Sequence, residues 1–440
     1  MNPVEQALAE FVTSVHYQDL PTYAQRQLIR ALGDLVGVSI AGLGTESANI
    51  VLRLAGRLFP GNEATVVGRG RTCSAAGAAM ANAAAASALD LDDGYRPAKG
   101  HPGAIVVPAA LASAEKNGSS GADFLAAIAA GYETGLRTAV AWHTSRETYH
   151  GSGSWGSVGA AAACARLAEL SPEQTLQALA IAEFHAPLAP TMASVDHPST
   201  AKNAVYWGAV VGLTAVELAA EGFTAPPSTL ASVVSSVDTL GTDWWLERIY
   251  YKFMPCCRWA QPAVAGVVAL RENHGIDPES IQRVSIRTFS AAARLNVTSP
   301  KTTVDAQYSL PFPAACALLH GNLSVAHITG NGLTDPKALE LASRVDMSTD
   351  SELESRFPEE ALARVTVILK DGRELTIGPI AASGDADTPP TDAELRSKFM
   401  ELSQPVLASD KAEALHQRIL GCPELTDIRR LTELLGDLHQ

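Results

Sequence analysis

One stretch near residue 80 limits the folds that are open to this chain. From Thr72 to Leu89 no charged residue occurs and alanine predominates. The run is long enough to span a membrane, but Ser, Asn and Gly recur through it, so it predicts a closely packed helix of a soluble protein. Asp90, Asp92 and Asp93 follow directly. Carboxylates at the end of a buried helix are costly unless they have partners or a task, so the segment predicts a small-molecule site.

Size and charge narrow the class of protein. The chain has 440 residues, 47% of them hydrophobic, which allows a large core and favours two domains. The formal net charge of −14 argues against nucleic acid as a partner, because phosphate binding needs a basic face. We expect no membrane span. The first residues do not form a basic stretch followed by an apolar one, so we also expect a cytoplasmic protein.

The cysteines predict neither a metal site nor an iron–sulfur cluster. Their positions are Cys73, Cys164, Cys256, Cys257, Cys316 and Cys422. None forms a C-x-x-C pair and no spacing is repeated, so ligand geometry for zinc or iron is not indicated. We expect reduced, mostly structural thiols.

The spacing of apolar residues divides the chain into a helical part and a part that also contains strands. Up to about Ile249, apolar residues recur at helical spacing, and helices are expected over 21–40, 103–116, 121–143, 157–170, 172–184 and 206–222. Beyond Lys252, strands are expected over 283–289, 364–369 and 374–377, with helices over 308–320 and 335–345. Residues 391–440 return to amphipathic helix. The sequence therefore predicts a mainly α protein, with a large all-helical domain (1–254 and 386–440) and an inserted α+β domain (255–385).

Further polar residues stand where loops lead into helices, which are common binding positions. His150 precedes a glycine- and serine-rich segment, and Lys202, Lys252, Arg258 and Tyr308 occupy comparable places. Each also has a simpler reading. A lone histidine is more often a hydrogen-bonded structural residue, a lone lysine is usually solvated, and a glycine-serine segment can be a plain connector.

Together these segments resemble a known family. The pattern consists of Asp90-Leu-Asp-Asp93, His101-Pro-Gly, His150-Gly-Ser-Gly-Ser-Trp-Gly, the helix near Lys202, Pro255-Cys-Cys-Arg258-Trp and Gln307-Tyr-Ser-Leu-Pro311. It is similar to the MmgE/PrpD family, which includes 2-methylcitrate dehydratase, cis-aconitate decarboxylase and iminodisuccinate epimerase. The resemblance implies an all-helical domain built from both chain ends, an inserted α+β lid domain, and a homodimer.

The resemblance also implies catalytic roles, residue by residue. Asp90 matches an active-site aspartate, and His101 matches the histidine taken to act on the substrate proton. His150 matches a second histidine. Lys252 matches a lysine ahead of the Pro-Cys segment, and Lys202 matches a lysine at the head of a helix, although the residues after it are out of register with the family.

Two positions depart from the family pattern. Gly94 stands where a threonine often follows the acids, and Phe312 stands where a tyrosine often ends the Ser-Leu-Pro segment. Both changes remove a hydroxyl group. They put the usual dehydratase or decarboxylase chemistry in doubt and favour an epimerase somewhat.

Removal of a proton next to a carboxylate creates an enolate with added negative charge, so such a site must gather cations. We expect His101 to act as acid or base, helped by Asp90, His150, Lys202 and Lys252, and we expect Arg258, Asp93, Ser152 and Tyr308 to contact a small anionic carboxylate. No metal and no cofactor are expected. The leading hypothesis is a lyase of the 2-methylcitrate dehydratase type. The alternatives are an epimerase of an iminodisuccinate-like amino-dicarboxylate and a carboxylate-binding protein without turnover.

Overall fold

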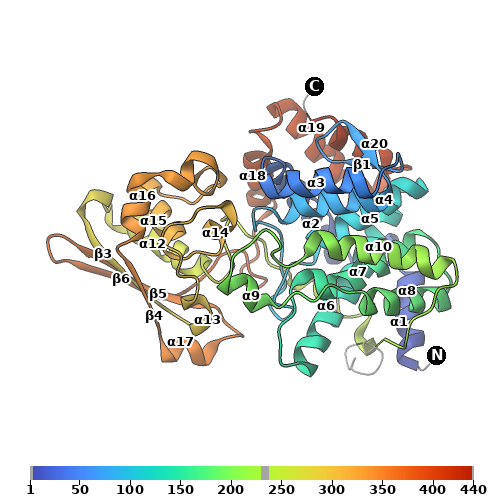
Figure 1. The fold of residues 1–440 in the computed structure, drawn as a ribbon, viewed down its shortest axis with the longest axis horizontal. Helices are drawn as coiled ribbons and strands as arrows, with labels where there is room; N and C mark the ends of the chain where they lie inside the picture. The colour runs from blue at the N-terminus through green and yellow to red at the C-terminus, as the bar shows by residue number, and fades with distance from the viewer. Residues whose placement is uncertain (1–2, 229–236, 439–440) are drawn as a thin grey trace.

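The computed structural model describes residues 3–228 and 237–438. Helices make up most of it, so the prediction of a mainly α protein is confirmed. Figure 1 shows a large group of helices beside a smaller part that contains a sheet. The limits of the domains at 254/255 and 385/386 stay a prediction.

The helical part contains the N-terminal half of the chain. Its helices are α1 (Pro3–Ser14), α2 (Thr22–Gly42), α3 (Glu46–Leu58), α4 (Ala75–Ser87), α5 (Gly103–Asn117), α6 (Gly121–Ser145), α7 (Ser152–Leu167), α8 (Pro172–Phe184), α9 (Thr191–Asp196) and α10 (Val205–Ala220). A short antiparallel hairpin, β1 (Ala64–Val66) and β2 (Arg71–Cys73), lies between α3 and α4. The sequence patterns did not predict this hairpin.

Helices from the C-terminal end lie against those from the N-terminal end (Figure 1). They are α18 (Asp392–Ser403), α19 (Ser409–Leu420) and α20 (Arg429–Gly436). Thr391 and Glu394 cap the start of α18 reciprocally. Lys398 on α18 and Asp34 on α2 form a buried ion pair, with Nζ 2.6 Å from Oδ1. This pair and the packing of α18 on α2 join the two ends of the chain.

The alanine-rich stretch forms α4, which is buried from Ala75 to Ala86. Small residues let its neighbours approach at backbone distance. A Cβ on Gly42, the last residue of α2, would lie 2.0 Å from the carbonyl oxygen of Ala85. The close packing expected for this stretch is therefore present in the structure.

The smaller part is built on a four-stranded sheet in the order β4-β3-β5-β6. Its strands are β3 (Ile281–Thr288), β4 (Val345–Thr349), β5 (Leu362–Leu369) and β6 (Glu374–Ala381). The β3–β4 pair is parallel and the other two pairs are antiparallel. Helix α12 (Gln261–His274) packs on β5 and β6, and α15 (Pro311–His320) packs on α12. The remaining helices here are α13 (Ser290–Ala293), α14 (Thr303–Gln307), α16 (Pro336–Ala342) and α17 (Ser351–Arg356).

Three expected elements have different limits in the structure. Helix α7 begins at Ser152 instead of 157, so the glycine-serine segment is its buried first turn and not a flexible loop. The helix expected over 308–320 begins at Pro311, a residue suited to the first turn of a helix, and a separate short helix, α14, ends at Gln307. The helix expected over 335–345 ends at Ala342, and Val345 begins β4, which was not expected.

Two properties of the whole chain concern membranes and cysteines. Within residues 3–228 and 237–438, no single helix has the length and apolarity of a membrane span, although α2 and α3, bent by 93°, have them jointly. All six cysteines are free thiols, and five of them are buried.

Candidate active site

The three carboxylates follow the end of α4 and are all buried. Asp90 has a φ of +55°, a left-handed conformation that aspartate tolerates better than most residues. The turn at Asp90 directs the chain away from the helix. Asp90, Asp92 and Asp93 thereby enter the same region as His101, which lies just ahead of α5.

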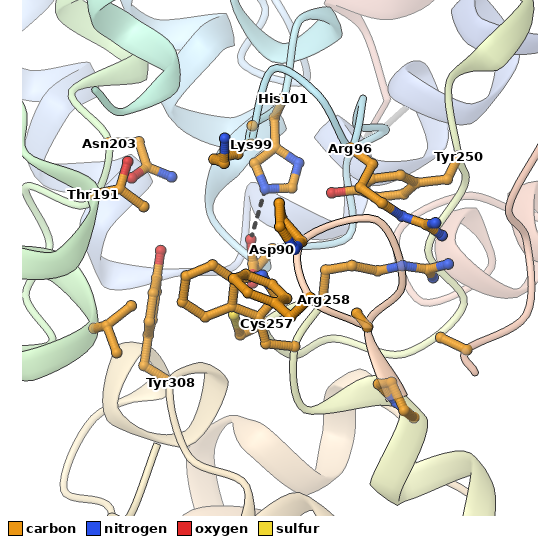
Figure 2. Close-up of a pocket in the computed structure, with 18 of the residues that line it drawn as sticks. Asp90, Arg96, Lys99, His101, Thr191, Asn203, Tyr250, Cys257, Arg258 and Tyr308 are labelled. Carbon is orange, nitrogen blue, oxygen red and sulfur yellow. Dashed lines mark ion pairs between the residues drawn. The ribbon is translucent and has the colours of Figure 1, made fainter. Parts of the chain in front are cut away.

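The ring of His101 is held in one tautomer by the backbone. Its Nδ1 lies 2.6 Å from the carbonyl oxygen of Asp93, and a carbonyl oxygen can only accept, so Nδ1 carries the proton. The amide N–H of His101 donates to Oγ of Ser152 at 2.9 Å. Nε2 is left without a proton in the neutral ring and lies 3.6 Å from Oδ1 of Asp90 (Figure 2). This nitrogen is suited to accept a proton from a substrate.

Asp93 positions this histidine from behind. Its two carboxylate oxygens accept hydrogen bonds from the amide of Gly103, at 3.0 Å, and from the hydroxyl of Tyr132, at 2.6 Å. Burial raises the pKa of Asp93 to about 7, with the Tyr132 hydrogen bond opposing and the charges of Asp34 and Asp92 adding to the shift. The side chain of Asp93 is therefore held by Gly103 and Tyr132, and its backbone carbonyl accepts the hydrogen bond from His101.

Two lysines supply positive charge to Asp90. Nζ of Lys252 lies 3.1 Å from Oδ1 of Asp90, and Lys252 is fully buried. Burial alone would raise the pKa of Asp90, but Lys252, Lys202 and His101 outweigh it and hold that pKa below its ordinary value. Lys202 has a φ of +42° and donates from Nζ to the carbonyl of Ser87 at 2.8 Å. Burial lowers the pKa of Lys202, while Asp90 and Asp92 oppose the shift.

These groups border a cavity between the helical part and the sheet-containing part (Figure 2). The polar residues lining it are Asp90, Arg96, Lys99, His101, Thr191, Asn203, Tyr250, Cys257, Arg258, Tyr308 and Asp385. Figure 2 shows Tyr308 entering from the segment between α14 and α15, with its hydroxyl directed toward Asn203 and Thr191. Burial raises the pKa of Tyr308 well above its usual value, so the hydroxyl stays protonated at neutral pH.

Two guanidinium groups lie at one side of the cavity. Oδ2 of Asp385 is 2.6 Å from Nη2 of Arg96 and 2.9 Å from Nη2 of Arg258. Arg258 also donates to the carbonyl of Ser383 at 2.8 Å and covers the ring face of Tyr250 at 4.5 Å. A pair of arginines around one carboxylate is the arrangement that recognises carboxylates generally.

Of the expected site residues, Asp90, His101, Arg258 and Tyr308 line the cavity. Asp93, Lys202 and Lys252 do not line it but act on Asp90 or His101 from behind. His150 and Ser152 are buried but do not line this cavity, as far as the described residues define it. The ring of His150 packs edge-on against Trp142. Burial lowers the pKa of His150, with a smaller contribution from Arg146. Ser152 accepts the amide of His101, so its contact is with the histidine.

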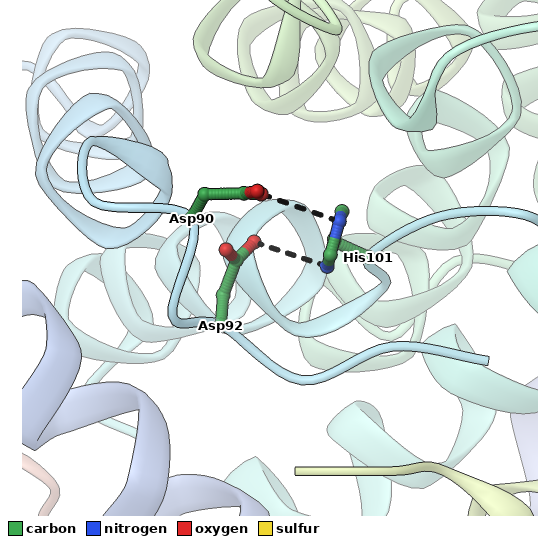
Figure 3. A group of neighbouring side chains, drawn as sticks. All are labelled: Asp90, Asp92 and His101. Atoms are coloured by element: carbon green, nitrogen blue, oxygen red, sulfur yellow. Dashed lines mark ion pairs between the residues drawn. The ribbon is translucent and has the colours of Figure 1, made fainter. Parts of the chain in front are cut away.

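Asp90, Asp92 and His101 also form a group that could hold a metal ion, with one ligand atom of each within 4.8 Å of the others (Figure 3). The donor set fits a metal poorly. Nδ1 of His101 is committed to Asp93, and Lys252 places a positive charge on the same oxygen of Asp90 that a metal would need. Both oxygens of Asp92 are buried without a hydrogen bond among residues 3–228 and 237–438, and the charge of Lys202 acts on Asp92.

The two hydroxyl-free positions have different surroundings. Phe312 is fully buried in the apolar core around the sheet, away from the cavity lining described above. Gly94 pairs with Tyr250 through both backbone hydrogen bonds, Gly94 N to Tyr250 O at 3.0 Å and Tyr250 N to Gly94 O at 2.7 Å. The space beside Gly94 is filled by the Tyr250 side chain.

Several lining residues were not singled out from the sequence, namely Arg96, Lys99, Thr191, Asn203, Tyr250 and Asp385, and Cys257 was expected to be a structural thiol. Arg96 and Lys99 lie within the segment between the acids and His101, and Tyr250 and Cys257 adjoin Lys252 and Arg258. Proximity to those segments was the only signal for these four residues, and the sequence offered none for Thr191 or Asp385.

Comparison with known proteins assigns the chain to a family. It is 26% identical over 474 residues to cis-aconitate decarboxylase of Mus musculus, covering 99% of this chain and 94% of that protein. It is 26% identical over 464 residues to cis-aconitate decarboxylase of Homo sapiens, covering 97% and 93%. It is 23% identical over 473 residues to cis-aconitate decarboxylase-like protein oryM of Aspergillus oryzae, covering 98% and 97%.

Family models match both parts of the chain. Residues 6–243 match the MmgE/PrpD N-terminal domain, and residues 254–420 match the MmgE/PrpD C-terminal domain. The resemblance inferred from the short motifs is thus confirmed over most of the sequence, and the chain belongs to the MmgE/PrpD family.

Proposed function

We propose that this protein is a lyase that needs no cofactor and moves a proton at a carbon next to a carboxylate of a small di- or tricarboxylate. One observation carries the proposal. Nε2 of His101 faces the cavity without a proton, because the carbonyl of Asp93 holds Nδ1–H. A histidine in that state acts as a general base, and as the imidazolium it returns the proton. Asp90 stabilises that imidazolium from 3.6 Å.

The charges around the cavity favour an anionic substrate. Arg96, Lys99 and Arg258 line it, and Lys252 and Lys202 act on Asp90 behind it. The protein as a whole has a net charge of −14, so this cluster of positive side chains contrasts with the rest of the chain. Cations placed before the reaction lower the free energy of the enolate without reorganisation during the step. Arg96 and Arg258 share one carboxylate, that of Asp385, so their charges are only partly balanced and this side of the cavity can attract a substrate carboxylate.

Cis-aconitate is the first substrate to test, because the relatives reported above are named for its decarboxylation. Dehydration of 2-methylcitrate is the second candidate, since loss of water needs a proton donor and the buried hydroxyl of Tyr308 remains protonated. Epimerisation of an iminodisuccinate-like acid and carboxylate binding without turnover are further outcomes of the same test.

The proposal includes a lid role for residues 255–385, which contribute Cys257, Arg258 and Tyr308 to the cavity opposite Asp90 and His101. We further propose a homodimer and a cytoplasmic location. Sedimentation or light scattering of the purified protein checks the first of these, and fractionation of the source cell checks the second.

The test of function is a panel of carboxylates with product identification. The purified protein is incubated with cis-aconitate, 2-methylcitrate and iminodisuccinate, and CO2, unsaturated acid and stereoisomers are quantified. Loss of CO2 or water from one acid supports a lyase. Formation of stereoisomers alone overturns the lyase proposal in favour of an epimerase. Saturable binding without any product shows that the protein binds carboxylates but does not convert them.

A further inference from the structure

The Tyr250 side chain occupies the space that a side chain at position 94 would need. A Cβ built on Gly94 would lie 2.3 Å from both Cζ and Oη of Tyr250. The two residues also pair through both backbone hydrogen bonds, so their separation is fixed. A side chain at 94 and the present position of the phenol exclude each other.

The phenol of Tyr250 is part of the reactive side of the cavity. Tyr250 lines it together with Asp90, His101 and Arg258. Its ring stands edge-on to that of His101, with 6.5 Å between centroids, and the guanidinium of Arg258 lies 4.5 Å from its centroid. In Figure 2 the hydroxyl end of the ring is directed toward His101.

The hydroxyl itself is a donor that the protein leaves unused. Oη of Tyr250 makes no hydrogen bond with any residue in the described ranges 3–228 and 237–438. It is not one of the buried unpartnered atoms there, so it is open to the cavity that Tyr250 lines. Burial raises the pKa of Tyr250, and Arg258 opposes the shift, so the O–H stays protonated at neutral pH. A protonated hydroxyl that is open to the cavity can donate a hydrogen bond to an oxygen of a bound ligand.

We propose that Tyr250 is a specificity-determining residue whose hydroxyl donates a hydrogen bond to an oxygen of the bound carboxylate, and that Gly94 provides the clearance for it. The inference rests on the proposed function. It assigns a hydroxyl donor to the face of the cavity between His101 and Arg258. A substrate oxygen placed there lies beside the histidine that moves the proton.

The test compares two hydroxyl deletions at adjacent positions. Tyr250→Phe keeps the ring, its contact with Arg258 and its packing, and removes only the donor. Tyr251→Phe is the matched control, because Tyr251 is 1% exposed, also has a hydroxyl without a hydrogen bond in the described chain, and does not line the described cavity. We expect Tyr250→Phe to lower kcat/KM on the acid that the wild type converts by about 10- to 100-fold with Tm unchanged, and Tyr251→Phe to leave it unchanged.

Gly94→Ala tests the clearance. It should displace the phenol and lower kcat/KM to at least the level of Tyr250→Phe. Equal kcat/KM in wild type and Tyr250→Phe, or equal losses in both tyrosine variants, overturns the proposal, and so does an active Gly94→Ala protein.

Binding of citrate separates this inference from the proposed function. If the wild type converts no acid in the panel, the proposed function fails, and the rise in Tm produced by citrate still measures the contact. A smaller rise in Tyr250→Phe than in the wild type and Tyr251→Phe supports the hydroxyl donor. An equal rise in all three proteins overturns it.

Discussion

The proposed proton transfer depends on one atom, Nε2 of His101. Asp93 determines its tautomer, Ser152 fixes its backbone, and Asp90 lies beside Nε2. Asp90 and Asp93 belong to the segment after α4 and Ser152 to the first turn of α7, so two parts of the fold orient the imidazole before any substrate binds.

Replacement of His101 by Asn tests its role as acid and base. Asparagine keeps polarity but cannot titrate, so we expect kcat to fall by at least about a hundredfold. His320→Asn is the control, because His320 lies at the end of α15 and pairs with Asp335. Steady-state kinetics on the preferred acid provide the measurement. A rate that is unchanged in His101→Asn moves the base to another residue, with His150 next in line.

Asp93 gives the fold a pH dependence of known sign. Its pKa of about 7 in the folded protein exceeds the value of about 3.9 in unfolded chains, so the folded state holds this proton more tightly. The stability that the group contributes is complete below about pH 4 and is lost as pH rises to about 7, at up to about 1.4 kcal/mol per pH unit.

Asp93→Asn imitates the protonated carboxyl and removes this dependence. The Tm of the wild type minus that of the variant should therefore fall between pH 5 and pH 7 and level off above pH 8. Thermal unfolding at each pH measures it. A constant or rising difference across that range contradicts the assignment.

The site residues that could be predicted from the sequence are charged or titratable residues in places where such residues are unusual. Three acids after an uncharged helix, and a histidine before Pro-Gly, stand out because burial of such groups needs a reason. Tyr250, Arg96 and Asn203 do not stand out, since such residues are common in loops and only the tertiary fold determines which way they face. His150 and Ser152 show the converse, because the fold places them behind the cavity lining.

In the helical part, several glycines lie where two helices approach so closely that a Cβ atom would not fit. The first turn of α7 is rich in glycine and serine, which reads as a connector by propensity. The structure buries it, because a Cβ on Gly153 would lie 2.2 Å from the carbonyl oxygen of Ala204. Tertiary contact overrides local preference there, and this is why the helix was expected to start five residues later. The strands β1 and β2 have three residues each, too few for a periodic pattern to reveal. Strand β4 begins at Val345, where the end of a helix was expected.

Two glycines of α2 make a matched pair for this argument. Gly42→Ala places a methyl group 2.0 Å from the backbone of α4, which cannot give way, so we expect a loss of about 1–3 kcal/mol. Gly33→Ala meets nothing closer than 3.8 Å, from Ile419, and gains helix propensity of about 0.5–1 kcal/mol. Chemical denaturation of both variants measures the difference. Equal stabilities show that α2 and α4 are packed more loosely than described.

Phe312→Tyr tests whether position 312 belongs to the core of the sheet-containing part. The phenylalanine ring is fully buried among apolar side chains. A hydroxyl there lacks a partner, and we expect a loss of about 1–3 kcal/mol in the free energy of unfolding. The ratios of kcat/KM among cis-aconitate, 2-methylcitrate and iminodisuccinate should stay the same. If the ratios of kcat/KM change while the free energy of unfolding does not, position 312 contributes to the site.

At the scale of the whole molecule, the cavity depends on both parts of the chain. The acids and His101 come from the helical part, and Cys257, Arg258 and Tyr308 come from the segment that leads into and includes the smaller part. The sequence predicts a change from helices to strands after Lys252, because helical spacing gives way to β-branched runs, and the first strand of the four-stranded sheet, β3, begins at Ile281. The sequence could not predict the order of the four strands, which depends on pairings distant in sequence.

The central claim is that His101 transfers a proton at a carbon next to a carboxylate. The most direct measurement is incorporation of deuterium from D2O, followed by NMR, starting from cis-aconitate with protein dialysed against a strong chelator. We predict one deuteron at such a carbon in the product or the recovered acid, formed at least about a hundredfold more slowly by His101→Asn. Absence of incorporation in this acid and the rest of the panel, an equal rate in the variant, or loss of the reaction on removal of metal would contradict the claim.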